Sequence, residues 1–227
     1  MTLSENLSRI QERIAAAASK SGRSPGDVTL VAVSKTRTAK EVEAAIRAGV
    51  SVLGENRVQE AEGKRASVSL PAQWHLVGHL QRNKVGTALG LFDLIHSVDS
   101  VRLAREIGKQ AGEGKVVRAL VQVNVSGEVS KFGFSPDETP DRVAEIGSVE
   151  GLEVEGLMTI GAHESDPEKV RPGFEKLRAI SERVSAVRQD GVRMKHLSMG
   201  MSGDFEVAIE AGATLVRVGT ALFGARE

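Results

Sequence analysis

Several residues that could do chemistry follow short apolar runs, at the places where buried strands would end. Lys35 comes just after the run 29–33, which is short and β-branched and therefore predicts a buried strand. An unpaired ammonium beside a core is costly. We therefore interpret Lys35 as an amine that forms a Schiff base, activated by desolvation and by a neighbouring cation such as Arg37. The alternative is a lysine at the rim of the fold whose ammonium reaches water.

Two further polar clusters end predicted strands. Glu55, Asn56 and Arg57 follow one apolar run, and His79 follows the next. The side chains of Glu55, Asn56 and His79 could orient a ligand or exchange protons. The plain alternative is that Asn56 caps a helix while Glu55 forms an ion pair with Arg57.

Two loops rich in small residues lie near the end of the chain. Their candidate ligand-binding residues are Ser198, Met199, Gly200 and Ser202 in the first loop and Arg217, Gly219 and Thr220 in the second. Glycines let backbone amides approach an anion, so the two loops predict a phosphate site, unless they are simply tight turns. Arg217 could contact that phosphate or a ring nitrogen. A phosphate site combined with Lys35 predicts pyridoxal 5′-phosphate (PLP), which carries its aldehyde and its phosphate group on neighbouring carbons of one ring.

For the remaining candidate residues the sequence predicts mainly structural roles. Met158 and Met199 are expected to pack in the core, where they could also flank a flat ring. Lys131 is interpreted as a solvated loop lysine. The histidines within predicted strands are expected to be core residues, namely His75, His96 and His196. The chain has no cysteine, so we expect no metal site.

The elements that would position these residues alternate between strand and helix. The predicted strands are 29–33, 52–54, 74–77, 94–98, 119–125, 154–160, 196–199 and 214–218. Helical stretches separate them, the clearest running from about 167 to 187 after a start signal at Ser165. About eight strand–helix units favour a (β/α)₈ TIM barrel, with a doubly wound sheet as the runner-up. No linker divides the chain, so we expect a single domain over 1–227.

The composition narrows the class of protein. The 227 residues carry 30 Lys+Arg and 30 Asp+Glu, and this balance argues against a nucleic-acid partner. No long apolar run predicts a membrane span, and the first residues lack a secretory pattern, so we expect a cytoplasmic protein.

Several of these segments together resemble the pyridoxal phosphate homeostasis protein family. The matching segments are 31–36, 54–60, 74–81, 156–160, 197–202 and 216–220, and they extend over nearly the whole chain. Arg82 departs from the pattern, because the family commonly has a small residue there; it lies beyond a strand end, away from the expected ligand.

The resemblance implies a PLP-binding barrel like the N-terminal domain of alanine racemase, usually monomeric, with PLP held as a Schiff base on Lys35. By the same resemblance, the loops 198–202 and 217–220 hold the phosphate, and Asn56, His79 and Met158 surround the ring. The family is thought to bind and deliver PLP, with apo-enzymes as possible recipients, and to influence vitamin B6 and amino-acid balance.

We expect no catalytic residues. Alanine racemase resembles this fold but uses a second base, a tyrosine from an additional domain, whereas this chain contains no tyrosine and has no residues left after the barrel. Two alternatives stay open. One is a genuine PLP enzyme, such as a one-base racemase or a lyase, and the other is a cofactor-free Schiff-base aldolase or isomerase acting on a sugar phosphate.

Overall fold

Eight parallel strands close into a barrel in the computed structural model, which describes residues 2–128, 130–161 and 166–224. The strands are β1 (Thr29–Val33), β2 (Val52–Glu55), β3 (Gln73–Leu76), β4 (Leu94–Val98), β5 (Val117–Gln122), β6 (Leu152–Met158), β7 (Val192–Met201) and β8 (Leu215–Val218). Each strand pairs with its neighbours in chain order, and β8 pairs with β1, with Val31 opposite Arg217. The predicted (β/α)₈ barrel is confirmed, and the doubly wound alternative is wrong.

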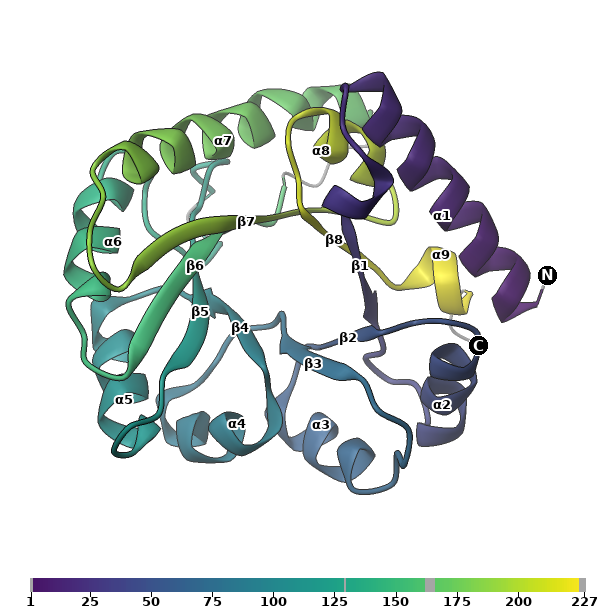
Figure 1. Cartoon of the computed structure of the whole chain (residues 1–227), viewed down its shortest axis with the longest axis horizontal. Coiled ribbons are helices and arrows are strands. Elements are labelled where there is room, and N and C mark those ends of the chain that lie inside the picture. Colours follow the sequence, from purple (N-terminus) through teal and green to yellow (C-terminus); the bar gives the residue numbers. More distant parts are fainter. Residues whose placement is uncertain (1, 129, 162–165, 225–227) are drawn as a thin grey trace.

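Helices form a ring outside the strands (Figure 1). The α-helices are α1 (Leu3–Lys20), α2 (Ala39–Arg47), α3 (Val58–Arg65), α4 (Val85–Leu91), α5 (Val101–Ala111), α6 (Thr139–Gly147), α7 (Arg171–Ala186), α8 (Phe205–Glu210) and α9 (Thr220–Phe223). Short 3-10 turns lie at η1 (Pro25–Asp27), η2 (Arg82–Lys84) and η3 (Pro167–Val170). The helix predicted from about 167 therefore begins as a 3-10 turn, and its predicted start signal at Ser165 lies outside the described residues. Among the described residues, no helix combines the length and the apolar character needed to cross a bilayer.

The first helix completes this ring where α8 and α9 are short. It packs along both of them, and two ion pairs fasten it to α8, between Arg13 and Glu206 at 2.5 Å and between Lys20 and Glu210 at 2.7 Å (Figure 1). Its start is fixed by a capping box in which Thr2 and Glu5 satisfy each other's backbone amides. The barrel is therefore covered on the side where the chain begins and ends.

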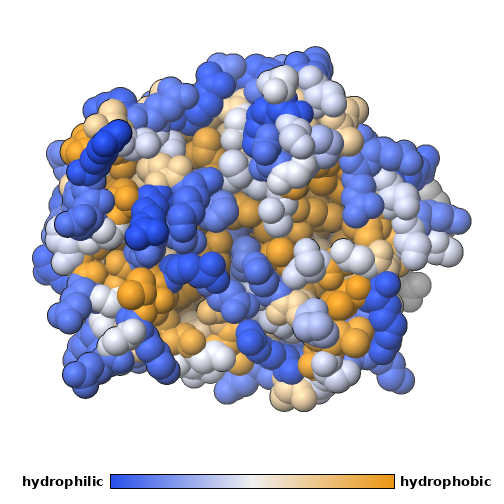
Figure 2. All heavy atoms as spheres, in the orientation of Figure 1, coloured by the Kyte–Doolittle hydropathy of each residue, from blue (hydrophilic) through white to orange (hydrophobic). Residues whose placement is uncertain are grey.

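Two apolar layers hold the barrel together. The larger one lies between strands and helices, and fully buried Phe174 and Phe205 belong to it. The smaller one fills part of the barrel interior with Val31, Val52, Val77, Leu94, Leu120, Met158 and Leu215. In the view down the short axis, polar residues cover most of the outer edge, and polar and apolar residues lie together in the middle of the face (Figure 2). The interior also holds linked polar side chains, those of His75, His96, Ser198 and Arg217, where barrels are normally filled by aliphatic layers.

Candidate functional site

The predicted site residues gather at the carboxyl ends of the strands. Lys35 follows β1, Asn56 follows β2, and His79 lies in the loop after β3. The loops after β7 and β8 contribute Ser202 and Gly219. Because all eight strands are parallel, these positions share one end of the barrel, which is the end that carries ligand sites in this fold.

Lys35 lies in the turn between β1 and α2, and its side chain is exposed. The prediction that burial would desolvate this lysine is therefore wrong. Arg37 is committed elsewhere, because it donates to the Gly224 carbonyl at 2.6 Å, pairs with Glu41 at 3.2 Å and covers the ring of Phe223. Lys35 therefore lies at the rim of the barrel with an exposed amine, a position compatible with either role that the sequence allows.

The residues after β2 have other partners than the sequence suggested. Glu55 is fully buried and accepts a hydrogen bond from the Ser34 hydroxyl at 2.6 Å. Its ion-pair partner is Lys64, at 2.6 Å, rather than Arg57. Asn56 is half-buried and does not cap α3, since Arg57 occupies the cap position without a side-chain bond. Burial raises the pKa of Glu55, while Lys64 and the Ser34 hydroxyl work against that rise.

His79 stands at the rim with two neighbours that the sequence analysis missed. Its Nδ1 lies 3.0 Å from Asp99 Oδ2, and its ring stacks on Phe132 with centroids 4.1 Å apart. Phe132 is 55% exposed, and it comes from the loop after β5. Lys131 beside it is held rather than solvated, because its Nζ donates to the Gly161 carbonyl at 3.0 Å and to Glu128 at 2.6 Å.

The two methionines lie on opposite sides of the barrel wall. Met158 ends β6 and is fully buried in the interior layer. Met199 is also fully buried, but it packs in the layer between strands and helices. The structure therefore does not bring them to the two faces of one ring, and only the side chain of Met158 lies inside the barrel.

A chain of buried polar groups crosses the barrel interior from Arg217. Arg217 Nη1 donates to Ser198 Oγ at 2.6 Å, and Nη2 donates to the Thr159 carbonyl at 2.7 Å. Ser198 Oγ lies 2.9 Å from His96 Nδ1, and His96 Nε2 lies 3.0 Å from His75 Nδ1. These bonds use only part of the donor set of the guanidinium and fix its plane. They explain how a cation only 5% exposed is accommodated in the barrel.

Burial determines the protonation states of the ionisable side chains in this series of buried polar groups. It lowers the pKa of Arg217 to about 10, opposed by the charge of Asp204, and leaves the guanidinium cationic at neutral pH. Burial also lowers the pKa of His75 to about 4 and that of His96 well below its ordinary value. Both imidazoles are therefore neutral, as expected of core histidines. His196 fits that expectation less well, because it is half-buried and its Nδ1 has no hydrogen-bond partner among the described residues.

The loops after β7 and β8 are joined to each other. Ser202 Oγ accepts from the backbone amides of Gly219 and Ala221, both at 3.3 Å. Gly200 has a φ of +89°, and a Cβ there would lie 2.5 Å from that of Ala208. Thr220 is exposed at the start of α9. These features make two adjoining, sterically tight backbone loops with polar groups at their surface.

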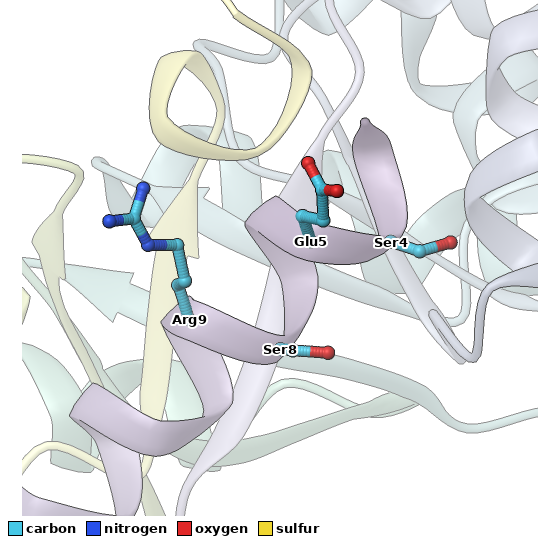
Figure 3. A pocket seen from close by; sticks show the side chains of 4 residues that line it. All are labelled: Ser4, Glu5, Ser8 and Arg9. Carbon is cyan, nitrogen blue, oxygen red and sulfur yellow. The ribbon is translucent and has the colours of Figure 1, made fainter. Parts of the chain in front are cut away.

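The glycine in the second loop also touches the strand that carries the lysine. A Cβ at Gly219 would lie 3.2 Å from the carbonyl oxygen of Val33, the last residue of β1. Hence the loop after β8 and the turn of Lys35 are direct neighbours. A separate hollow of about 550 Å³ lies along α1, outside the barrel wall, where Ser4, Glu5, Ser8 and Arg9 line it (Figure 3). None of the predicted site residues lines that hollow.

The sequence and the fold both match known proteins over almost their full length. The family model described as alanine racemase, N-terminal domain, matches residues 6–227. A protein of Aquifex aeolicus named pyridoxal phosphate homeostasis protein is 43% identical over 229 residues, which cover 100% of both chains. Its namesake in Escherichia coli K12 is 40% identical, over 99% of this chain and 97% of that protein.

Solved structures agree with these sequence matches. PipY of Synechococcus elongatus, solved with PLP bound, superposes with a TM-score of 0.85 at 33% identity and covers 98% of this chain and 100% of PipY. Alanine racemase of Clostridium difficile superposes with a TM-score of 0.75 at 19% identity, over 99% of this chain and 56% of the racemase, which shows a shared fold. The chain belongs to the pyridoxal phosphate homeostasis protein family and carries the alanine racemase N-terminal domain.

Proposed function

We propose that the protein binds PLP at the carboxyl end of its barrel and acts in intracellular PLP homeostasis as a carrier or regulator. One observation carries this proposal. The turn of Lys35 and the loop of Gly219 adjoin, because β1 pairs with β8 and a Cβ at Gly219 would touch Val33. An amine and an anion-binding backbone thus lie side by side, as a ligand with an aldehyde and a phosphate requires.

The residues present fit such a ligand. Lys35 offers an exposed amine for the aldehyde. The glycine loops 198–202 and 217–220 offer backbone amides and hydroxyls for the phosphate, including those of Ser202 and Thr220. The Arg217 guanidinium donates to Ser198 Oγ and to the Thr159 carbonyl, and its remaining N–H groups are available to the ring nitrogen or the phosphate. Asn56, His79 and Met158 complete the proposed lining, whereas Met199 contributes only its backbone.

We expect storage and delivery rather than robust catalysis. PLP supplies an electrophilic aldehyde and an electron-withdrawing ring, and turnover then needs protein groups that move protons. Among the described residues, the two interior histidines are neutral and engaged in the chain from Arg217. The exposed mouth around Lys35 lets water and acceptor molecules reach the amine, which suits release. Recipients would be apo-enzymes that need PLP.

Titration of the purified protein with PLP tests the proposal. A visible absorption band should appear on the wild-type protein and on Lys40→Ala, which removes an exposed lysine in the first turn of α2. The band should be missing from Lys35→Ala. An equal band on Lys35→Ala would refute the role of this lysine. Steady turnover of an amino acid at about 1 s⁻¹ or faster would favour the alternative of a genuine PLP enzyme.

A further inference from the structure

A buried ionic cluster lies beneath the turn that carries Lys35. It consists of Ser34, Glu55, Glu60 and Lys64, from the end of β1, the end of β2 and helix α3. Lys64 is only 8% exposed, and its Nζ lies 2.6 Å from Glu55 Oε1 and 2.8 Å from Glu60 Oε1. The chemistry proposed above does not use this lysine.

The cluster forms hydrogen bonds with the backbone on both sides of Lys35. On the N-terminal side, Lys64 Nζ donates to the carbonyl oxygen of Ser34, while the Ser34 hydroxyl donates to Glu55 at 2.6 Å. On the C-terminal side, the backbone amide of Thr36 donates to Glu60 Oε1. Since Lys64 also pairs with Glu60, one ammonium on α3 links both peptide groups that flank Lys35.

The conformation held there is an uncommon one. Thr36 has a φ of +64°, a left-handed value that a β-branched residue rarely adopts. Such a conformation persists only where the surroundings impose it. In this turn the contact that holds the Thr36 amide comes from Glu60, and Glu60 is held by Lys64.

A contribution to folding stability does not by itself explain this buried ionic cluster. Burying charged groups carries a desolvation cost that an apolar pair at the same place would not carry. In addition, one oxygen of Glu55, Oε2, has no hydrogen-bond partner among the described residues. An arrangement that is costly and yet fixes a strained turn beside a reactive amine is typical of a functional site.

We propose that Lys64 is a positioning residue for Lys35: through Ser34 and Glu60 it holds the turn in the conformation that presents the Lys35 amine to the ligand. This inference rests on the proposed function. Lys64 is buried under the turn and is not itself a ligand contact. Without it, Glu60 loses its ion-pair partner and the carbonyl of Ser34 loses its donor. The turn can then adopt other conformations, and the Lys35 amine is in its reactive position only part of the time.

The test separates binding from covalent linkage in Lys64→Met. Pyridoxamine 5′-phosphate has the ring and phosphate of PLP but no aldehyde, so its affinity, measured by calorimetry, reports the non-covalent site. With PLP, the Lys35 amine adds to the aldehyde with loss of one water, and borohydride then reduces the C=N bond to an amine that mass spectrometry detects. We expect pyridoxamine 5′-phosphate to bind Lys64→Met as it binds the wild type, while the rate of trapped product falls about 10- to 100-fold.

Two companion variants make the result decisive. Lys20→Met changes an exposed lysine of α1, breaks its ion pair with Glu210 of α8 and should trap PLP at the wild-type rate. Glu60→Ala removes the acceptor of the Thr36 amide from a partly exposed position and should show the same selective loss as Lys64→Met, even if Lys64→Met fails to fold. Wild-type trapping rates in Lys64→Met or Glu60→Ala would overturn the inference, as would an equal loss of pyridoxamine 5′-phosphate binding. If the wild-type protein itself traps no PLP, the proposed function fails instead.

Discussion

Lowering the pH from about 7 to about 5 should destabilise this fold through the histidines buried inside the barrel. Burial lowers the pKa of His75 to about 4 and that of His96 well below its ordinary value, whereas both titrate near 6.5 in the unfolded chain. Between the folded and the unfolded pKa values, the two histidines are protonated in the unfolded chain and stay unprotonated in the native state. Their contribution to stability is therefore present above the unfolded pKa and is lost as the pH falls toward the folded one.

The size of the effect follows from the pKa difference. One pKa unit corresponds to about 1.4 kcal/mol, and a pH of about 5 lies roughly 1.5 units below the unfolded pKa of His75. His75 alone should therefore remove about 2 kcal/mol of unfolding free energy at that pH. His96 acts in the same direction, but the two rings share one hydrogen bond and titrate as a pair, so their effects do not simply add. Burial raises the pKa of Glu55 and of Asp204, which has the opposite sign.

Urea denaturation of the wild type and of His75→Asn, at several pH values in this window, isolates the histidine term. The asparagine does not titrate, and its amide offers both a donor and an acceptor to His96 Nε2. The carboxylate contributions cancel in the comparison. We expect the wild type to lose about 2 kcal/mol more than the variant between the two pH limits. Leu120→Ala, in the same interior layer, should lower stability equally at every pH. Parallel pH dependence in wild type and His75→Asn would refute the reasoning.

Two further predictions concern the loops after β7 and β8. Gly200→Ala should lower the free energy of unfolding by about 1–3 kcal/mol, because φ is +89° and the new Cβ would lie 2.5 Å from that of Ala208; an unchanged melting temperature would contradict this steric account. Ser198→Ala should weaken PLP binding by roughly tenfold in calorimetry, because it removes the acceptor that orients Arg217; unchanged affinity would show that Arg217 needs no such support.

The fold was predictable because fully buried parallel strands leave short apolar runs in the sequence. The predicted runs overlap all eight strands of the barrel. The predicted 119–125 and 154–160 are displaced toward the C-terminus relative to β5 and β6, and β7 extends from Val192 to Met201, beyond the predicted 196–199. The candidate site was predictable for a related reason, since parallel strands bring residues that are distant in sequence to one end of the barrel. Lys35, Asn56 and Gly219 could thus be grouped without any knowledge of their contacts.

The partners of these residues were not predictable, because they depend on packing between elements. Lys64 lies on a helix rich in charges and looks like a surface residue, and the only local signal is its spacing of four from Glu60. The stack of Phe132 on His79 depends on how two loops meet over the barrel mouth. Strand alternation alone could have separated Ser198 from Met199, since neighbouring strand residues face opposite sides.

The most direct test of the central claim is to locate the covalent attachment of PLP. The wild-type protein is incubated with PLP, reduced with borohydride and digested, and its peptides are sequenced by mass spectrometry. The account predicts one dominant modified peptide, with the added mass on Lys35, the exposed lysine after β1. Modification spread over exposed lysines such as Lys40 and Lys109, with Lys35 unmodified, would contradict it.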